Sequence, residues 1–131
     1  MQRMAVNPWD WSLKVGYNQA EAIEGARRQL VCAGQTAVDG EGRPQHAGDM
    51  RAQMALALDN LEAALAAAGM GLGDVVRLSI ASTDVDETLR HGDVMGARFG
   101  PAGNAPPQTL LGVTRLALPD LMFEVEATAM A

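Results

Sequence analysis

Apolar side chains recur every three or four residues over residues 49–68, and this spacing predicts an amphipathic α-helix. The apolar stripe consists of Met50, Met54, Leu58, Leu61, Leu65 and Ala68. Asp49 is a suitable N-cap, and Gly69 follows the stripe, where a glycine commonly ends a helix. A second helix is predicted over residues 85–99, although two glycines within it each lower helix stability by about 1 kcal/mol relative to alanine.

Two-residue alternation and β-branched residues predict two or three strands before the first helix, one strand between the helices and two after the second. The clearest of them cover residues 29–34, 75–82, 109–116 and 122–129. In the last strand, alternate apolar side chains face one side, whereas Glu124, Glu126 and Thr128 face the other. The order of elements predicts an α+β fold in which a single mixed β-sheet carries two helices on one face. The other face is too polar for a dry core and suits an oligomer interface or a binding site.

Composition and charge narrow the classes of function. The chain of 131 residues is the length of one domain, and its hydrophobic content of 48% argues against disorder. The net charge of −6, with no basic cluster, argues against nucleic acid as a partner. No run approaches the ~20 apolar residues of a membrane span, so no membrane partner is expected. The single cysteine, Cys32, allows no intramolecular disulfide, and with no recognisable signal peptide we expect a cytoplasmic protein.

Four segments carry a resemblance to a known family: residues 30–35 (LVCAGQ), 59–61 (DNL), 73–84 (GDVVRLSIASTD) and 124–129 (EVEATA). In this order they resemble the RidA family of reactive-intermediate deaminases, also called YjgF-like proteins. The resemblance implies a chorismate-mutase-like subunit in a homotrimer, with a central β-barrel and the helices outside. Residues 1–15 are then expected to form an N-terminal extension, and residues 16–131 the RidA-like domain.

The same resemblance implies hydrolysis of enamines and imines, such as 2-aminoacrylate and 2-iminopropanoate, to a 2-keto acid and ammonia. It implies clefts between subunits and no metal or organic cofactor. Glu124 would position or activate the attacking water, and Tyr17, Gly34 and Gln35 would bind substrate. A carboxyl group suits this chemistry because it can hold a water and pass a proton to the leaving nitrogen. The alternatives are an interface salt bridge for Glu124 and a surface-packed aromatic for Tyr17, while Glu126 is expected to form an ion pair.

The late loop departs from the family pattern at Gln108, where active imine deaminases carry an arginine that clamps the substrate carboxylate. A neutral amide cannot replace such a charge-assisted contact, whose loss costs about 1.5–3 kcal/mol. Arg115 would lie ~23 Å further along the same predicted strand and face the other side. Arg77 or an arginine of the next subunit is the remaining candidate. Thr109 and His91 complete the predicted substrate-binding set, with a solvated helix residue as the alternative for His91.

The sequence leaves two functions open. One is a RidA-like hydrolase of a carbon–nitrogen bond whose substrate is not the standard 2-imino acid, and the other is a non-catalytic trimer that binds a small metabolite. RNA cleavage, from an older family label, disagrees with the acidic charge. Cys32 is expected to be a buried, inert thiol, and with the isolated His46 and His91 it predicts no metal site. Trp9 and Trp11 are expected to cap a subunit edge or, alternatively, to cover the cleft.

Overall fold

The computed structural model describes residues 1–131 and has a five-stranded main sheet. Its strands are β3 (Gln29–Val31), β4 (Gln35–Thr36), β5 (Val75–Ser82), β6 (Gln108–Gly112) and β7 (Phe123–Met130). The order across the sheet is β3-β7-β5-β6, and β4 also pairs with β7. β5 and β6 are parallel, whereas the other pairs are antiparallel. The predicted α+β fold with one mixed main sheet is confirmed.

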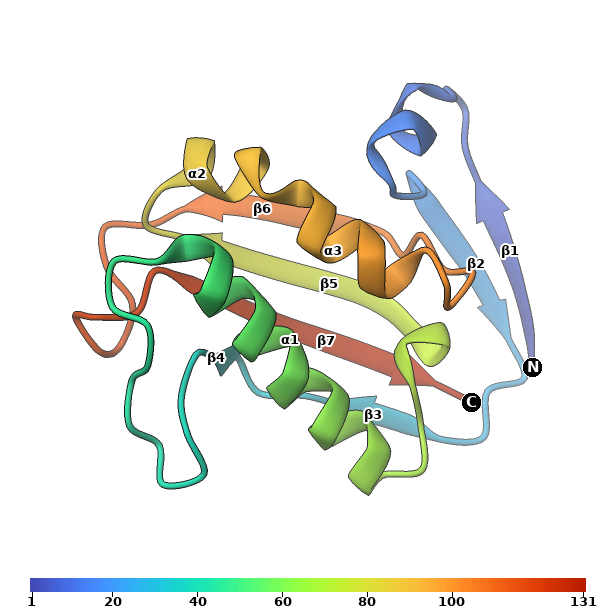
Figure 1. Ribbon diagram of the computed structural model, residues 1–131. Helices are drawn as coiled ribbons and strands as arrows, with labels where there is room; N and C mark the ends of the chain where they lie inside the picture. Colours follow the sequence, from blue (N-terminus) through green and yellow to red (C-terminus); the bar gives the residue numbers. More distant parts are fainter.

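All three helices lie on one face of this sheet, and no helix covers the other face (Figure 1). The helices are α1 (Met50–Ala67), α2 (Val85–Arg90) and α3 (Gly92–Phe99). Apolar side chains of α1 pack on the inward positions of β7 in a core that is closed to solvent. The fully buried members at this contact are Met54, Leu58, Leu61, Leu65, Phe123, Val125 and Ala129. The predicted N-cap is confirmed, because the Ala52 amide donates to the Asp49 carboxylate at 3.0 Å.

His91 divides the second predicted helix into α2 and α3. Its φ of −102° and ψ of 24° lie outside the helical range, and the poor helix former Gly92 follows it. The short α2 is held in place by Thr88, whose buried hydroxyl hydrogen-bonds Ser82 Oγ at 2.7 Å. The apolar spacing alone could not show this break, because Val85 and Phe99 would share a face in one continuous helix.

Two predicted strands are shorter than expected. The strand predicted over residues 109–116 begins at Gln108 and ends at Gly112, because Ser82, the last residue of its partner β5, lies directly opposite. Arg115 is therefore not on a strand, and its guanidinium donates to neighbouring backbone carbonyls at 3.1 Å. The strand predicted over residues 29–34 ends at Val31, and the chain pairs with β7 again only in β4.

The N-terminal residues form a separate two-stranded antiparallel sheet of β1 (Gln2–Val6) and β2 (Ala20–Glu24). The connection between these strands contains the 3₁₀ turn η1 (Trp11–Val15). This hairpin lies beside the β5–β6 side of the main sheet (Figure 1). The amide of Asn18 donates to the Ala105 carbonyl at 2.8 Å, so the hairpin is hydrogen-bonded to the loop that precedes β6.

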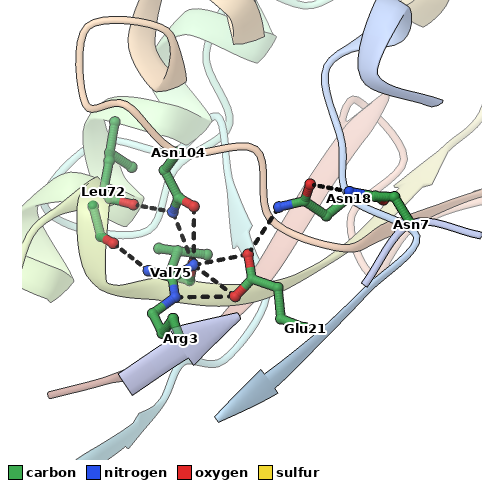
Figure 2. Close-up of polar contacts among 8 residues, drawn as sticks. Arg3, Asn7, Asn18, Glu21, Leu72, Val75 and Asn104 are labelled. Atoms are coloured by element: carbon green, nitrogen blue, oxygen red, sulfur yellow. Dashed lines mark hydrogen bonds and ion pairs between the residues drawn. The ribbon is translucent and has the colours of Figure 1, made fainter. Parts of the chain in front are cut away.

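Arg3 joins the hairpin to the rest of the molecule (Figure 2). Its guanidinium donates to the Glu21 carboxylate at 3.0 and 3.1 Å. It also donates to the carbonyls of Gly73 and Val75 at 2.6 and 3.0 Å and to Asn104 Oδ1 at 3.0 Å. Glu21 lies within the hairpin, whereas Gly73, Val75 and Asn104 lie outside it, so Arg3 together with the Asn18 amide fixes where the hairpin, and with it η1, sits.

Candidate functional site

A hollow lies between η1 and the α2–α3 helices, and side chains of β5 and β6 also line it. It consists of two adjoining cavities of about 460 and 480 Å³, a size typical of small-molecule sites. The residues that line both cavities are Val15, Leu89, Gly92, Met95 and Gln108. The 460 Å³ cavity is the more apolar and extends to Met54, Ile80 and Leu110.

Tyr17 and Gln108 come together in the 460 Å³ cavity although they are far apart in the sequence. Tyr17 packs edge-on against Trp11, with ring centroids 6.1 Å apart. Gln108 begins β6 opposite Leu78, which is 1% exposed, so its side chain lies on the helix-covered face. No residue of the chain hydrogen-bonds the Gln108 amide or the Tyr17 hydroxyl. Both groups are therefore available to a ligand.

Glu124 lies in contact with Gly34 on the opposite face of the sheet. Its cross-strand partners are Ala81 and Thr36, and the side chains beside it in β7 point into the core. A Cβ at position 34 would approach Glu124 Cγ to 2.9 Å and would overlap its carboxylate. An alanine here would therefore displace the Glu124 side chain, and the carboxylate lies directly against the backbone of the turn between β3 and β4.

Within one chain the predicted site residues therefore form two groups on opposite faces of the sheet. Tyr17 and Gln108 line the helix-side hollow, whereas Gly34 and Glu124 lie on the open face. That open face also exposes apolar side chains, with Val31 72% and Leu111 57% exposed. Exposed apolar residues on an uncovered sheet favour burial against another chain.

The other predicted residues occupy less decisive positions. Thr109 lies on the open face, where its hydroxyl accepts a hydrogen bond from Arg77 at 3.3 Å. Arg77 and Glu126 line a small hollow on this face of about 130 Å³ but form no ion pair with each other in one chain. The Gln35 amide donates to the Ala33 carbonyl at 3.1 Å. His91 does not line the helix-side hollow, and its Nε2 lies 3.3 Å from a Glu87 carboxylate oxygen.

Sequence reasoning missed the contribution of η1 to the hollow. Leu13, Lys14 and Val15 line it, although they precede the region in which the family resemblance was recognised. Thr88 and Met95 were also missed, because their roles depend on how α2 and α3 lie over the sheet. One local signal was present: Lys14 is the only lysine in the chain.

Four ionisable groups outside the hollow have shifted pKa values, among them Cys32 and Asp93. Burial raises the pKa of the Cys32 thiol, in keeping with its predicted position inside the fold. The hydrogen bonds from Arg51, at 2.9 and 2.7 Å, lower the pKa of the exposed Asp93 carboxyl, and this pair connects α1 with α3. No three side chains of the metal-ligating types gather in one place. None of the helices combines the length and the apolar character needed to span a bilayer.

The fold, one mixed sheet with its helices on one face, defines a class of small α+β proteins, and comparison with known proteins identifies the family. Residues 12–131 match the family model described as endoribonuclease L-PSP. The chain belongs to this family, to which the RidA and YjgF-like proteins also belong, so the resemblance recognised in the sequence is confirmed.

Individual relatives extend this result over the whole chain. The solved structure of YyfB from Yersinia pestis, a Rid-family protein of unknown function, is 32% identical, covers 100% of both chains and has a TM-score of 0.89. The Escherichia coli protein TdcF, solved with bound serine, is 26% identical, with a TM-score of 0.71 over 88% of this chain and 87% of that one. A RutC family protein of Pyrococcus horikoshii is 31% identical over 76% of this chain and 77% of its own length.

Proposed function

We propose that this protein is a cofactor-independent hydrolase that acts on an imine or enamine carbon–nitrogen bond of a small metabolite. The observation that carries the proposal is that the Glu124 carboxylate lies against Gly34, where the absence of a Cβ leaves room for it. A hydrolytic deaminase needs such a group to activate water and return a proton. Membership of the RidA family supports the same chemistry.

The proposed reaction adds water across the carbon–nitrogen double bond. The substrate reacts as the protonated imine, and an enamine reaches this form by taking up a proton at its β-carbon. Glu124 accepts a proton from the attacking water while the new carbon–oxygen bond forms and the nitrogen takes the electron pair of the double bond, giving a neutral carbinolamine. The carboxyl group then passes that proton to the nitrogen, the carbon–nitrogen bond breaks and ammonia leaves, and the hydroxyl proton returns to the Glu124 carboxylate as the carbonyl compound forms. Atoms balance with water as the only co-reactant.

We further propose that the working site lies between subunits of a homotrimer. Tyr17 and Gln108 lie on the helix side of the sheet and Glu124 on its open face, so one chain does not unite them. The exposed Val31 and Leu111 support pairing of the open face with another copy. In this arrangement Glu124 of one subunit would face the hollow of its neighbour.

The side chain at position 108 determines which imine substrates we expect this site to hydrolyse. A neutral amide at this position provides no cation for the carboxylate of a small 2-imino acid, so we expect slow hydrolysis of 2-iminopropanoate. The same observation favours a second candidate function, a trimer that binds a small metabolite without turnover. TdcF was solved with serine, and this supports an amino-acid-sized ligand in either case.

A competition assay separates the two candidates. An amino-acid oxidase generates imines in situ, and the protein is tested for diverting them from semicarbazide to the keto acid. Hydrolysis that falls about 100-fold or more in Glu124→Gln would support the hydrolase. Glu126→Gln is the matched control, because Glu126 lies on the same face of the same strand, and it should retain activity. Equal turnover in both variants would overturn the role of Glu124.

Two further measurements complete this test. Gln108→Arg should raise the turnover of 2-iminopropanoate, because it restores a cation at position 108. If no imine is hydrolysed by either form and Glu124→Gln alters only ligand affinity, the binding function is correct. The mass of the assembly in solution, from light scattering, should equal three chains, and a monomer would contradict the shared site.

A further inference from the structure

The hollow described above contains one charge. Lys14 lines its 480 Å³ cavity together with Gln108, and no other charged residue lines either cavity. Lys14 lies in the last turn of η1, next to Val15, which lines both cavities. The only lysine of the chain thus lines the same cavity as Gln108, the position at which the family resemblance implies an arginine.

Lys14 has no partner within the chain. Five of the nine arginines form ion pairs with carboxylates, but no carboxylate and no carbonyl accepts a hydrogen bond from the Lys14 ammonium. The nearest helices hold their acids elsewhere, because Glu87 pairs with Arg90 and Asp93 with Arg51. The ammonium is therefore free for a ligand.

We propose that Lys14 is the anion-binding residue of this cavity and that the ligand is a small monocarboxylate with a branched aliphatic or aromatic body. This inference rests on the proposed function of the same site and names its substrate class. The ammonium pairs with the carboxylate on the η1 side, and the apolar body packs among Met54, Ile80 and Leu110. An ion pair beside apolar walls is stronger than one in open water because the effective dielectric constant is lower.

The change from an arginine at position 108 to a lysine on η1 also changes how the carboxylate is held. A guanidinium fork fixes a carboxylate in one plane, whereas an ammonium on a flexible stem is a compact point charge that tolerates several orientations. Combined with a cavity of about 460 Å³, this favours larger acids over three-carbon ones. Gln108 and Tyr17 remain available to hydrogen-bond the reacting part of the ligand.

Binding of a product-like acid tests the inference without any need for turnover. Titration calorimetry compares 4-methyl-2-oxopentanoate with its uncharged amide. Lys14→Gln should weaken binding of the acid about tenfold and leave the amide unchanged, while Lys14→Arg should stay within about threefold of the unmodified protein. Arg27→Gln is the control for loss of one positive charge, because Arg27 is exposed and lines no part of the hollow. Added salt should weaken binding of the acid only where Lys14 is present.

The uniqueness of Lys14 provides an independent readout. Reductive ¹³C-methylation labels only this side chain and the N-terminal amine. The Lys14 methyl resonance should shift on addition of the acid and not of the amide. Equal affinity for acid and amide, or undiminished binding in Lys14→Gln, would overturn the inference.

The test of the Lys14 anion site can fail or succeed independently of the test of the proposed hydrolase. Lys14-dependent binding in a protein that hydrolyses no imine would uphold the anion site and refute the hydrolase. Imine hydrolysis that is unaffected by Lys14→Gln would uphold the hydrolase and refute the anion site. Each variant is checked by circular dichroism, and no loss of fold is expected, because the Lys14 side chain is exposed and has no partner.

Discussion

Replacing Glu21 with alanine removes the carboxylate of β2 that orients Arg3, the side chain that hydrogen-bonds the N-terminal hairpin to the rest of the fold. The Glu21 side chain is only 5% exposed and accepts hydrogen bonds from Arg3 at 3.0 and 3.1 Å and from Asn18 at 3.2 Å. Breaking a buried ion pair from one side costs about 3–5 kcal/mol, because a charge is left without compensation. Arg3 is 21% exposed and keeps its other acceptors, so we expect a smaller loss, about 2–3 kcal/mol.

The two tryptophans make this loss measurable in the hairpin itself. Trp9 and Trp11 are the only tryptophans of the chain, and both lie between β1 and β2. Their fluorescence therefore reports unfolding of the hairpin, whereas far-ultraviolet circular dichroism reports mainly the helices. In urea, at an m-value of ~1.5 kcal/mol/M, the fluorescence midpoint should fall by roughly 1–2 M in Glu21→Ala. The dichroism midpoint should move less, since α1 and the main sheet keep their contacts.

Two variants make the test decisive. Glu24→Ala lies on the same strand, is exposed and has no side-chain partner, so it should leave both midpoints unchanged. Arg3→Met combined with Glu21→Met should lower the fluorescence midpoint further, because it also removes the hydrogen bonds of Arg3 to Gly73, Val75 and Asn104. Fluorescence and dichroism transitions that shift together by the same amount would refute a separately anchored hairpin. An unchanged fluorescence midpoint in Glu21→Ala would refute a role of the ion pair in orienting Arg3.

Three further predictions follow from single buried or crowded positions. Gly34→Ala should lower imine hydrolysis as strongly as Glu124→Gln in the semicarbazide assay, because the new methyl group displaces the carboxylate. As the control for stability, the urea midpoint of Gly34→Ala should be similar to that of Glu126→Gln. Gln53→Leu should destabilise the fold by about 3–5 kcal/mol in urea, since Gln53 is fully buried and hydrogen-bonds three carbonyls and one amide. Burial raises the pKa of Cys32, so the folded state holds the thiol proton more tightly than the unfolded state does. The free energy of unfolding should therefore fall as pH rises above the ordinary thiol pKa of ~8.5, and Cys32→Ala should remove this dependence on pH.

The sequence predicted the elements whose signals are local. The helix over residues 49–68 was correct in both bounds to within a residue, because its apolar period and its Asp49 cap are encoded in consecutive positions. The face of β7 was also correct, since strict alternation identifies the buried side. The break at His91 and the early end of β6 at Gly112 were not foreseen, because each depends on a partner element and not on local propensity.

The candidate site likewise has features that could be predicted from the sequence and features that depend on the three-dimensional structure. Tyr17, Gly34, Gln108 and Glu124 could be named because the family resemblance supplied them, and the structure pairs Tyr17 with Gln108 and Gly34 with Glu124. That the two pairs lie on opposite faces could not be read from spacing in the sequence. Lys14 was overlooked, since its place in the hollow depends on contacts between Arg3 and residues up to about a hundred positions away.

The affinity for a ligand in the hollow therefore depends on how firmly the hairpin is anchored. A cation on β6 would be positioned by the sheet itself, whereas Lys14 and Tyr17 belong to the connection between β1 and β2, and Arg3, oriented by Glu21, hydrogen-bonds this hairpin to the rest of the fold. A ligand bound between η1 and α3 favours the docked hairpin over the released one by RT ln(1 + [L]/Kd), so its affinity includes the cost of any undocking. A weakly anchored hairpin would lower affinity without altering one ligand contact. Arg3 and Glu21, which line neither cavity, thus contribute to ligand affinity through the position of the hairpin.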